Sequence, residues 1–140
     1  MKRIILYLLA FLSLALFVSG CPTASDVIKA KLGYEFTLPV GQTAVVEGED
    51  LELRFKMVLS DNRCPQGAQC IIAGEVRIIL EIKQNGSSDS AELSHPGLFE
   101  GYSLASYGQY QFIFKVLPYP EVGHQIAEDD YELKLTVTTS

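Results

Sequence analysis

The segment LELRFKMVL, residues 51–59, decides the fold of this chain. Its apolar residues alternate with charged ones over most of its length and stand at Leu51, Leu53, Phe55, Met57 and Leu59. Successive side chains of a β-strand point to opposite faces, so a period of two predicts a strand with one face in a core and one in water. We therefore expect these five side chains to be buried.

Three other segments repeat this alternation, at residues 76–83, 110–116 and 131–138. The first is followed by Asn-Gly at 85–86, a pair that accepts the positive φ of a tight hairpin turn. The second is followed by Pro-Tyr-Pro at 118–120, whose prolines cannot donate to a β-sheet ladder. Each segment is therefore expected to be a strand whose apolar stripe faces the same core.

Shorter strands are expected at residues 34–38, 43–46 and 88–93, and residues 98–106 are compatible with a helical turn. About seven short strands separated by frequent turn signals are typical of two packed antiparallel sheets. The predicted fold class is therefore all-β. We expect an antiparallel immunoglobulin-like β-sandwich of about seven strands over residues 34–140.

The first 20 residues have the three-part layout of a secretory signal peptide. Lys2 and Arg3 provide positive charge, fifteen apolar or near-apolar residues follow at 4–18, and two small residues end the segment. The apolar run is shorter than the roughly 20 residues that a spanning helix needs, and no basic stop-transfer cluster follows it. We therefore predict a cleaved leader over residues 1–20, with an uncleaved membrane helix as the alternative.

Residues 18–21, Val-Ser-Gly-Cys, resemble the lipobox of prokaryotic lipoproteins. The resemblance implies a thioether-linked diacylglycerol on Cys21 and cleavage just before it, whereas an ordinary secretory signal would be cleaved without lipidation. Two or more acyl chains hold a protein stably on a membrane. Residues 21–33 are then expected to be a lipidated tether. The expected location is the cell membrane or outer membrane, with the domain facing the periplasm or the cell exterior.

The chain carries 11 basic and 17 acidic residues, a formal net charge of −6. Lys2 and Arg3 precede Cys21 and no acidic residue does, so the mature chain keeps 9 bases against 17 acids and carries −8. So acidic a protein repels nucleic-acid phosphates, and we expect no nucleic-acid partner. Anionic lipid would repel it as well, so we expect the membrane to be contacted through the lipid on Cys21.

With Cys21 committed to lipid, Cys64 and Cys70 remain as a pair in an exported chain. Oxidising compartments favour disulfides, and the Pro/Gly turn at residues 65–69 can bring the two cysteines together. A disulfide that shapes one loop is therefore expected. Metal binding and a redox-active dithiol are the alternatives, although the spacing fits neither a zinc site nor Cys-x-x-Cys. No metal or other cofactor is expected.

Two pairs of segments resemble the signatures of a family of uncharacterised bacterial secreted proteins and lipoproteins. Residues 61–65, Asp-Asn-Arg-Cys-Pro, and 70–74, Cys-Ile-Ile-Ala-Gly, are similar to its Asp-Ser-Arg-Cys-Pro turn and Cys-x-Trp-Ala-Gly segment. Residues 117–120 and 126–131 are similar to its Pro-Tyr-Pro and the acidic-Tyr entry to its last strand. The resemblance implies the same fold and an exported location. This sequence departs from the family pattern at Asn62, in place of Ser, and at Ile72, in place of Trp.

Arg63 and Tyr119 are the candidate contact residues of these loops. Arg63 suits an anionic ligand, but its planar five-donor guanidinium is more typical of a structural ion pair or of bonds to loop carbonyls. Tyr119 either points outward or belongs to a turn that simply ends a strand. Tyr131 is a candidate tyrosine corner, with its hydroxyl bonded to nearby backbone. His95 and His124 lie beside turn residues, outside the alternating stripes, and are not expected to form a catalytic or metal site.

The sequence contains no convincing catalytic constellation, so we predict a non-enzymatic protein. The first hypothesis is a cell-envelope lipoprotein whose sandwich binds or scaffolds another envelope protein or polymer. The second is an inhibitor or ligand-capturing module that uses the Cys64–Cys70 loop, and the third is an enzyme or metal-handling protein. An exposed apolar patch would favour the first, a protruding rigid loop the second, and a concave pocket of histidines or carboxylates the third.

Overall fold

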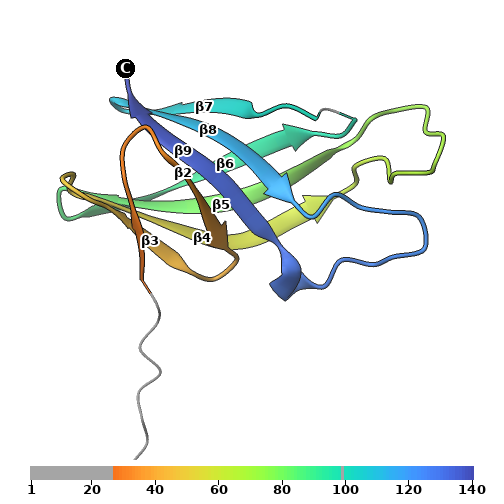
Figure 1. Ribbon diagram of the computed structural model, residues 1–140, viewed down its shortest axis with the longest axis horizontal. Coiled ribbons are helices and arrows are strands. Elements are labelled where there is room, and N and C mark those ends of the chain that lie inside the picture. The colour runs from red at the N-terminus through yellow and green to blue at the C-terminus, as the bar shows by residue number, and fades with distance from the viewer. Residues whose placement is uncertain (1–26, 99) are drawn as a thin grey trace, which may run out of the picture.

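The computed structural model describes residues 27–98 and 100–140, which form two packed β-sheets (Figure 1). One sheet has five strands in the order β1-β3-β4-β5-β6, and the other has four in the order β2-β9-β8-β7. A 3-10 turn, η1, spans Glu128–Asp130. The strands are β1 (Ile28–Ala30), β2 (Glu35–Pro39), β3 (Thr43–Val46), β4 (Leu51–Asp61), β5 (Glu75–Gln84), β6 (Ser87–Pro96), β7 (Ser103–Tyr107), β8 (Tyr110–Leu117) and β9 (Glu132–Thr139).

The predicted all-β sandwich is confirmed, with nine strands among the described residues in place of about seven. Neighbouring strands are antiparallel except for β1, which pairs in parallel with β3. The tether predicted over residues 21–33 is therefore too long, because Ile28–Ala30 belongs to the sheet and Ala30 is buried. Strands β3 to β6 lie side by side in chain order in one sheet, and β7 to β9 do so in the other. The chain crosses between the sheets after β1, after β2 and after β6.

The three stripes that the sequence predicts after residue 75 form most of the core. Every second residue of β5, β8 and β9 is buried, and these residues face one another between the sheets. Asn85 and Gly86 make the predicted hairpin turn, both with positive φ. The buried stripe residues are Val76, Ile78, Leu80, Ile82, Tyr110, Phe112, Phe114, Val116, Leu133, Leu135 and Val137.

Strand β4 departs from the predicted pattern in its second half. Its register against β5 shifts between Phe55 and Met57 and again between Val58 and Ser60, as at β-bulges. An extra residue on one strand moves the following side chains to the opposite face. Met57 and Leu59 are therefore exposed, and Val58 packs against the core in their place. The expectation that both are buried is wrong.

Residues 87–107 contain two further departures. The helical turn considered within 98–106 is wrong, because Ser103–Tyr107 is strand β7. His95 was expected in a turn but lies in β6, fully buried, with its Nδ1 2.8 Å from Ser103 Oγ and its ring against Phe114. Pairing of β6 with β5 extends to Pro96, so the residue before the proline keeps the inward direction of the strand.

The predicted leader and the lipidation site Cys21 lie outside the described residues. In the part of the chain that the structure describes, no helix is both long and apolar enough to cross a bilayer.

Candidate functional site

Three connections meet at one end of the sandwich, on the right of Figure 1. They are residues 62–74 between β4 and β5, residues 97, 98 and 100–102 between β6 and β7, and residues 118–131 between β8 and β9. Together we call them the loop end. Both pairs of segments that resemble family signatures fall within it or at its border, so the structure brings together residues more than fifty positions apart.

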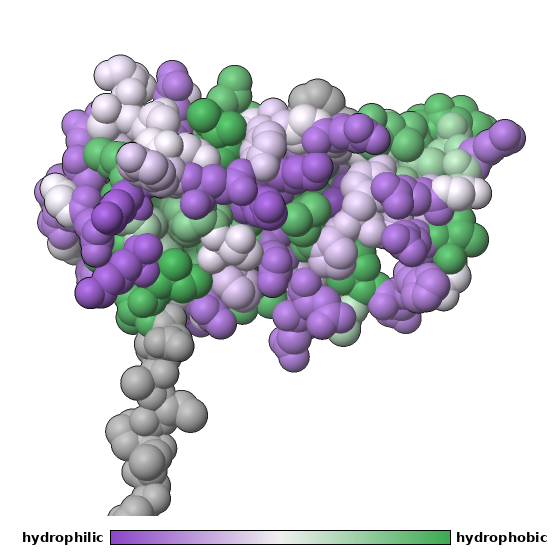
Figure 2. Space-filling view, in the orientation of Figure 1, coloured by the Kyte–Doolittle hydropathy of each residue, from purple (hydrophilic) through white to green (hydrophobic). Residues whose placement is uncertain are grey.

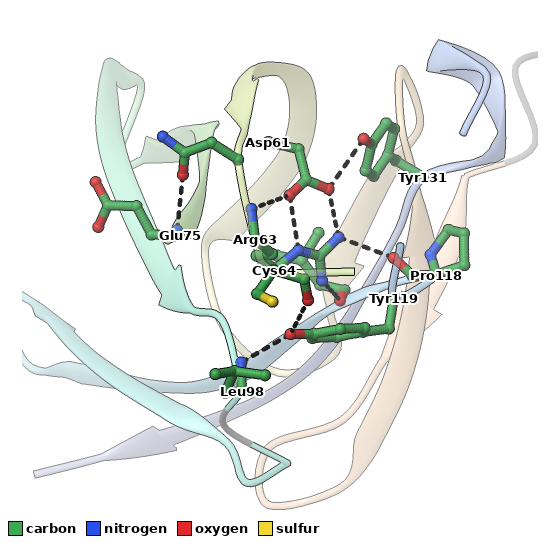
Figure 3. Close-up of polar contacts among 10 residues, drawn as sticks. Asp61, Arg63, Cys64, Glu75, Leu98, Pro118, Tyr119 and Tyr131 are labelled. Carbon is green, nitrogen blue, oxygen red and sulfur yellow. Dashed lines mark hydrogen bonds and ion pairs between the residues drawn. The ribbon is translucent and has the colours of Figure 1, made fainter. Parts of the chain in front are cut away.

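Arg63 holds the centre of the loop end, and its side chain is fully buried (Figure 3). Its Nε donates to Asp61 Oδ1 at 2.8 Å, and one terminal nitrogen donates to the other carboxylate oxygen. The remaining donors reach backbone oxygens, of Val116 at 3.0 Å and of Pro118 at 2.8 Å. The guanidinium therefore has a structural role: it forms an ion pair with Asp61 and donates hydrogen bonds to backbone carbonyls. An anionic ligand finds no free face of it.

Tyr119 belongs to the same network, and its ring packs against the Arg63 guanidinium. Its ring lies 5.0 Å from the Arg63 guanidinium carbon, a cation–π distance. Its hydroxyl donates to the carbonyl of Cys64 at 2.9 Å and accepts the N–H of Leu98 at 2.7 Å. Tyr119 is half-buried and ties the three connections together, so it belongs to the turn and does not form an outward aromatic platform.

Tyr131, at the start of β9, is buried and donates its hydroxyl to Asp61 Oδ2 at 3.1 Å. The tyrosine-corner prediction is therefore wrong, because the acceptor is a carboxylate and not nearby backbone. Burial, together with the charge of Asp61 and this hydrogen bond, raises the pKa of Tyr131 to about 12. The carboxylate of Asp61 thus receives donors from both Arg63 and Tyr131, which satisfies it in a site with little solvent.

Close backbone packing explains two glycines of the loop end. Residues 62 and 64 continue the ladder beyond β4 and β5, with Cys64 N–H donating to the carbonyl of Ala73 at 2.8 Å. A Cβ on Gly74 would stand 1.9 Å from Asn62 O, and one on Gly97 would stand 2.1 Å from Ala73 O. Only glycine fits at such a distance. The 62–74 and 97–102 connections are therefore packed backbone to backbone.

The predicted disulfide forms between Cys64 and Cys70, whose Cα atoms are 5.9 Å apart. It closes a small loop at the tip of the 62–74 connection. Gln66 anchors this loop to the next connection, since its N–H donates to Pro120 O at 2.9 Å and its carbonyl accepts the Val122 N–H at 3.1 Å. The disulfide, the backbone hydrogen bonds beyond β4 and β5, and the bonds of Gln66 to the 118–131 connection together restrain this loop.

Four large aliphatic side chains of the loop end are exposed to solvent. Ile71 and Ile72 follow the disulfide and are 104% and 75% exposed, and Leu98 and Val122 are more than half exposed. Figure 2 shows green atoms gathered at the end of the molecule where Figure 1 places these connections. Single exposed aliphatic residues are ordinary, but several on segments that are bonded to one another form a patch of the kind that contacts partners.

A hollow of about 480 Å³ lies beside this patch. Leu98, Leu117 and Tyr119 give it apolar walls, and Gln66, Glu100 and Lys115 give it a polar rim. Leu98 has a positive φ of 57°, a conformation that is an outlier for a bulky residue, and its N–H is held there by Tyr119. Strained residues that are fixed by their surroundings often occur at functional sites.

The two histidines do not share a solvent-facing site. His95 is enclosed between the sheets, whereas His124 is exposed in the 118–131 connection. Among residues 27–98 and 100–140, no group of three or more His, Cys, Asp or Glu side chains is placed to hold a metal ion.

The sequence pointed to the residues that support the loop end and missed those that cover its surface. Arg63, Tyr119 and the cysteines are noticeable because of their side-chain chemistry. Ile71 and Ile72, in contrast, are of a residue type that is common in strands such as β5. Two signals were available: Ile72 stands where the similar family has Trp, and two adjacent isoleucines break the period of two between a cysteine and the next stripe. Comparison with known proteins adds no name: no family model, curated protein or solved structure matches the chain.

Proposed function

We propose that this chain is a lipid-anchored cell-envelope protein whose sandwich is a non-enzymatic binding domain, and that the loop end is its contact surface. The observation that carries the proposal is the exposure of Ile71 and Ile72 on a loop held rigid by a disulfide and by the buried Arg63 network. A protein that hides most of its apolar surface in a core has no structural use for two aliphatic side chains in water.

Rigidity favours binding over a purely structural role for this loop. Ordering a flexible loop on association costs free energy, and a loop already fixed in the free protein avoids that cost. Here the loop is closed by Cys64–Cys70 and bonded through Gln66 to the 118–131 connection. The two isoleucines lie between Cys70, which is fixed by the disulfide, and Ala73, whose carbonyl accepts the Cys64 N–H, so both ends of their short segment are held.

The position of the proposed anchor is compatible with this use of the loop end. Strand β1 begins at Ile28, beside Ala44 and at the register of Leu53 and Ile82. The loop end begins beyond Val76, six residues away along β5, or about 20 Å at the rise of a β-strand. The strand that follows the proposed anchor thus begins at a distance from the loop end, which is compatible with an accessible contact surface there.

A second candidate function uses the same surface for a diffusible ligand. The protruding, rigid Cys64–Cys70 loop and the adjacent hollow favour an inhibitor or ligand-capturing module. The two functions differ in the partner: a fixed envelope component in the first, and a soluble molecule in the second. Photo-crosslinking in the cell separates them: mass spectrometry of the adduct identifies the partner, and fractionation of cells that were not crosslinked shows whether that partner belongs to the envelope or is soluble.

The test places a photo-reactive amino acid at position 71 of the full chain in its native cells, with position 104 as the matched control. Leu104 is also an exposed aliphatic residue, 73% exposed, but it lies on strand β7. A discrete adduct from position 71 and none from position 104 is expected, together with a lipid mass on Cys21. Loss of membrane retention in Cys21→Ser supports the anchor. Equal adducts from both positions, or an unmodified Cys21, would contradict the proposal.

A further inference from the structure

The charge around the loop end indicates what kind of partner it suits. On the faces of the sheets, most carboxylates are paired with bases: Glu35 with Lys134, Glu52 with Lys83, Glu81 with Arg54 and Lys56, and Glu75 and Glu92 with Arg77. In the loop end the pattern changes. Glu100, Glu121 and the three acidic residues of η1 form no ion pair with any described residue.

Two of these acidic residues lie on the same segments as exposed aliphatic residues: Glu121 directly precedes Val122, and Glu100 follows Leu98 by two positions. Glu121 forms a β-bridge with Gln66, inside the disulfide loop, and Val122 lies against Gly67 of that loop. Glu100 lines the hollow together with Leu98, and Lys115 donates to the backbone carbonyl of Glu100. Arg63 is buried and fully used, so it does not offset this charge. The loop end therefore combines exposed aliphatic side chains with an excess of negative charge.

The negative charge of the loop end also disfavours two other binding partners, a second copy of the chain and an anionic membrane. A second copy of the chain would bring two acidic loop ends together, and like charges across an interface cost free energy. An anionic membrane would repel the same carboxylates, although two exposed isoleucines alone would suit insertion into lipid. A partner with an apolar face and basic side chains beside it satisfies both features of the surface at once.

We propose that the loop end binds a cationic amphipathic polypeptide, either a free peptide or a segment of a larger protein. This inference rests on the proposed function and specifies its partner class. Apolar side chains of the partner pack on Ile71, Ile72 and into the hollow beside Leu98, and its lysines or arginines face Glu100 and Glu121. Such contacts at a rim mainly speed association and make it sensitive to salt, whereas the apolar contacts set the dissociation rate.

The test uses the full chain as the cell processes it, in nanodiscs of phosphatidylcholine, with empty nanodiscs as the blank. The probes are a short peptide of leucine and lysine that forms an amphipathic helix and its leucine–glutamate counterpart. The lysine peptide is expected to bind at least tenfold more tightly. Burial of the two isoleucines against the partner favours binding, so Ile71→Asn with Ile72→Asn is expected to weaken binding tenfold or more. Glu121→Lys should weaken it further and reduce its dependence on salt.

The control is Leu104→Asn, which removes an exposed aliphatic side chain from β7 and is expected to leave binding unchanged. Equal affinity for both peptides, or equal losses in the loop and control variants, would overturn the inference. Binding of the chain to phosphatidylglycerol vesicles that Ile71→Asn and Ile72→Asn abolish would also overturn it, in favour of a membrane. If position 71 gives a discrete adduct in cells but the lysine peptide does not bind, the proposed function stands and the partner class is wrong.

Discussion

Replacing Arg63 with methionine is expected to remove about 4 kcal/mol of folding free energy. The methionine fills similar space but leaves the Asp61 carboxylate, whose side chain is 8% exposed, without its counter-ion. Breaking a buried ion pair by removing one partner costs about 3–5 kcal/mol. The carbonyls of Val116 and Pro118 also lose their donor, at about 1 kcal/mol each where water does not replace it. Domains of this size are stable by only about 5–15 kcal/mol.

Urea unfolding followed by far-ultraviolet circular dichroism measures this loss. With an m-value of about 1.5 kcal/mol/M, the midpoint should fall by roughly 2–3 M. The matched control is Arg77→Met, because Arg77 also pairs with two carboxylates but its side chain is 45% exposed. Exposed pairs contribute about 0–1 kcal/mol, so the control should move the midpoint little.

A double-mutant cycle with Asp61→Asn tests the cause of the loss. The double variant no longer carries a buried charge without a partner, so it should be more stable than the sum of the two single losses predicts, by about 2 kcal/mol or more. If Arg63→Met lowers the free energy of unfolding no more than Arg77→Met does, or if the two single losses simply add, the Arg63 network does not stabilise the loop end.

Three further outcomes follow from the same region. Gly97→Ala should destabilise the domain by more than about 1 kcal/mol, measured by urea unfolding, because its Cβ would overlap a backbone oxygen 2.1 Å away. Replacing Cys64 and Cys70 with serine should cost about 2 kcal/mol without unfolding the sandwich, and thiol labelling should find no free thiol at either position in the unreduced domain. The pKa of Tyr131, about 12 when folded against about 10 when unfolded, adds stability that is complete below pH 10 and lost as the pH rises to 12. The fall, about 2 kcal/mol, should be smaller in Tyr131→Phe when urea midpoints are measured across that range.

The sequence predicts the sandwich because most strands have one face in the core and one in solvent, and their apolar residues then alternate regularly. In β5, β8 and β9 every second residue is buried, as the alternation requires. The prediction fails at Met57 and Leu59 because the register shifts after Phe55 and again after Val58, and the sign of this in the sequence is that Val58 interrupts the alternation between them. It fails at His95 because a histidine beside a proline is typical of a turn, whereas strand pairing continues through both residues.

The loop end was predictable in part, for the same kind of reason. Arg63 was expected to form an ion pair or to bond loop carbonyls, and it does both. Which carbonyls it reaches could not be predicted, because Val116 and Pro118 come from a connection more than fifty residues later and only the packing of two sheets brings them near. The disulfide was predictable from the expected export of the chain and from its cysteine count, since disulfide formation depends on the compartment more than on the fold.

The residues that attract attention in this sequence and those that we propose to contact a partner are different sets. Arginine, tyrosine and cysteine are noticeable because their chemistry is specific, and here that chemistry is used inside the protein, where unpaired polar groups cost most. Isoleucine is common in β-proteins, and it is the exposure of Ile71 and Ile72 after folding that makes them candidates for contact with a partner. The buried network fixes where the two isoleucines stand. Substitutions in the network should therefore weaken binding only through the fold, whereas substitutions of the isoleucines should weaken binding and leave the unfolding midpoint unchanged.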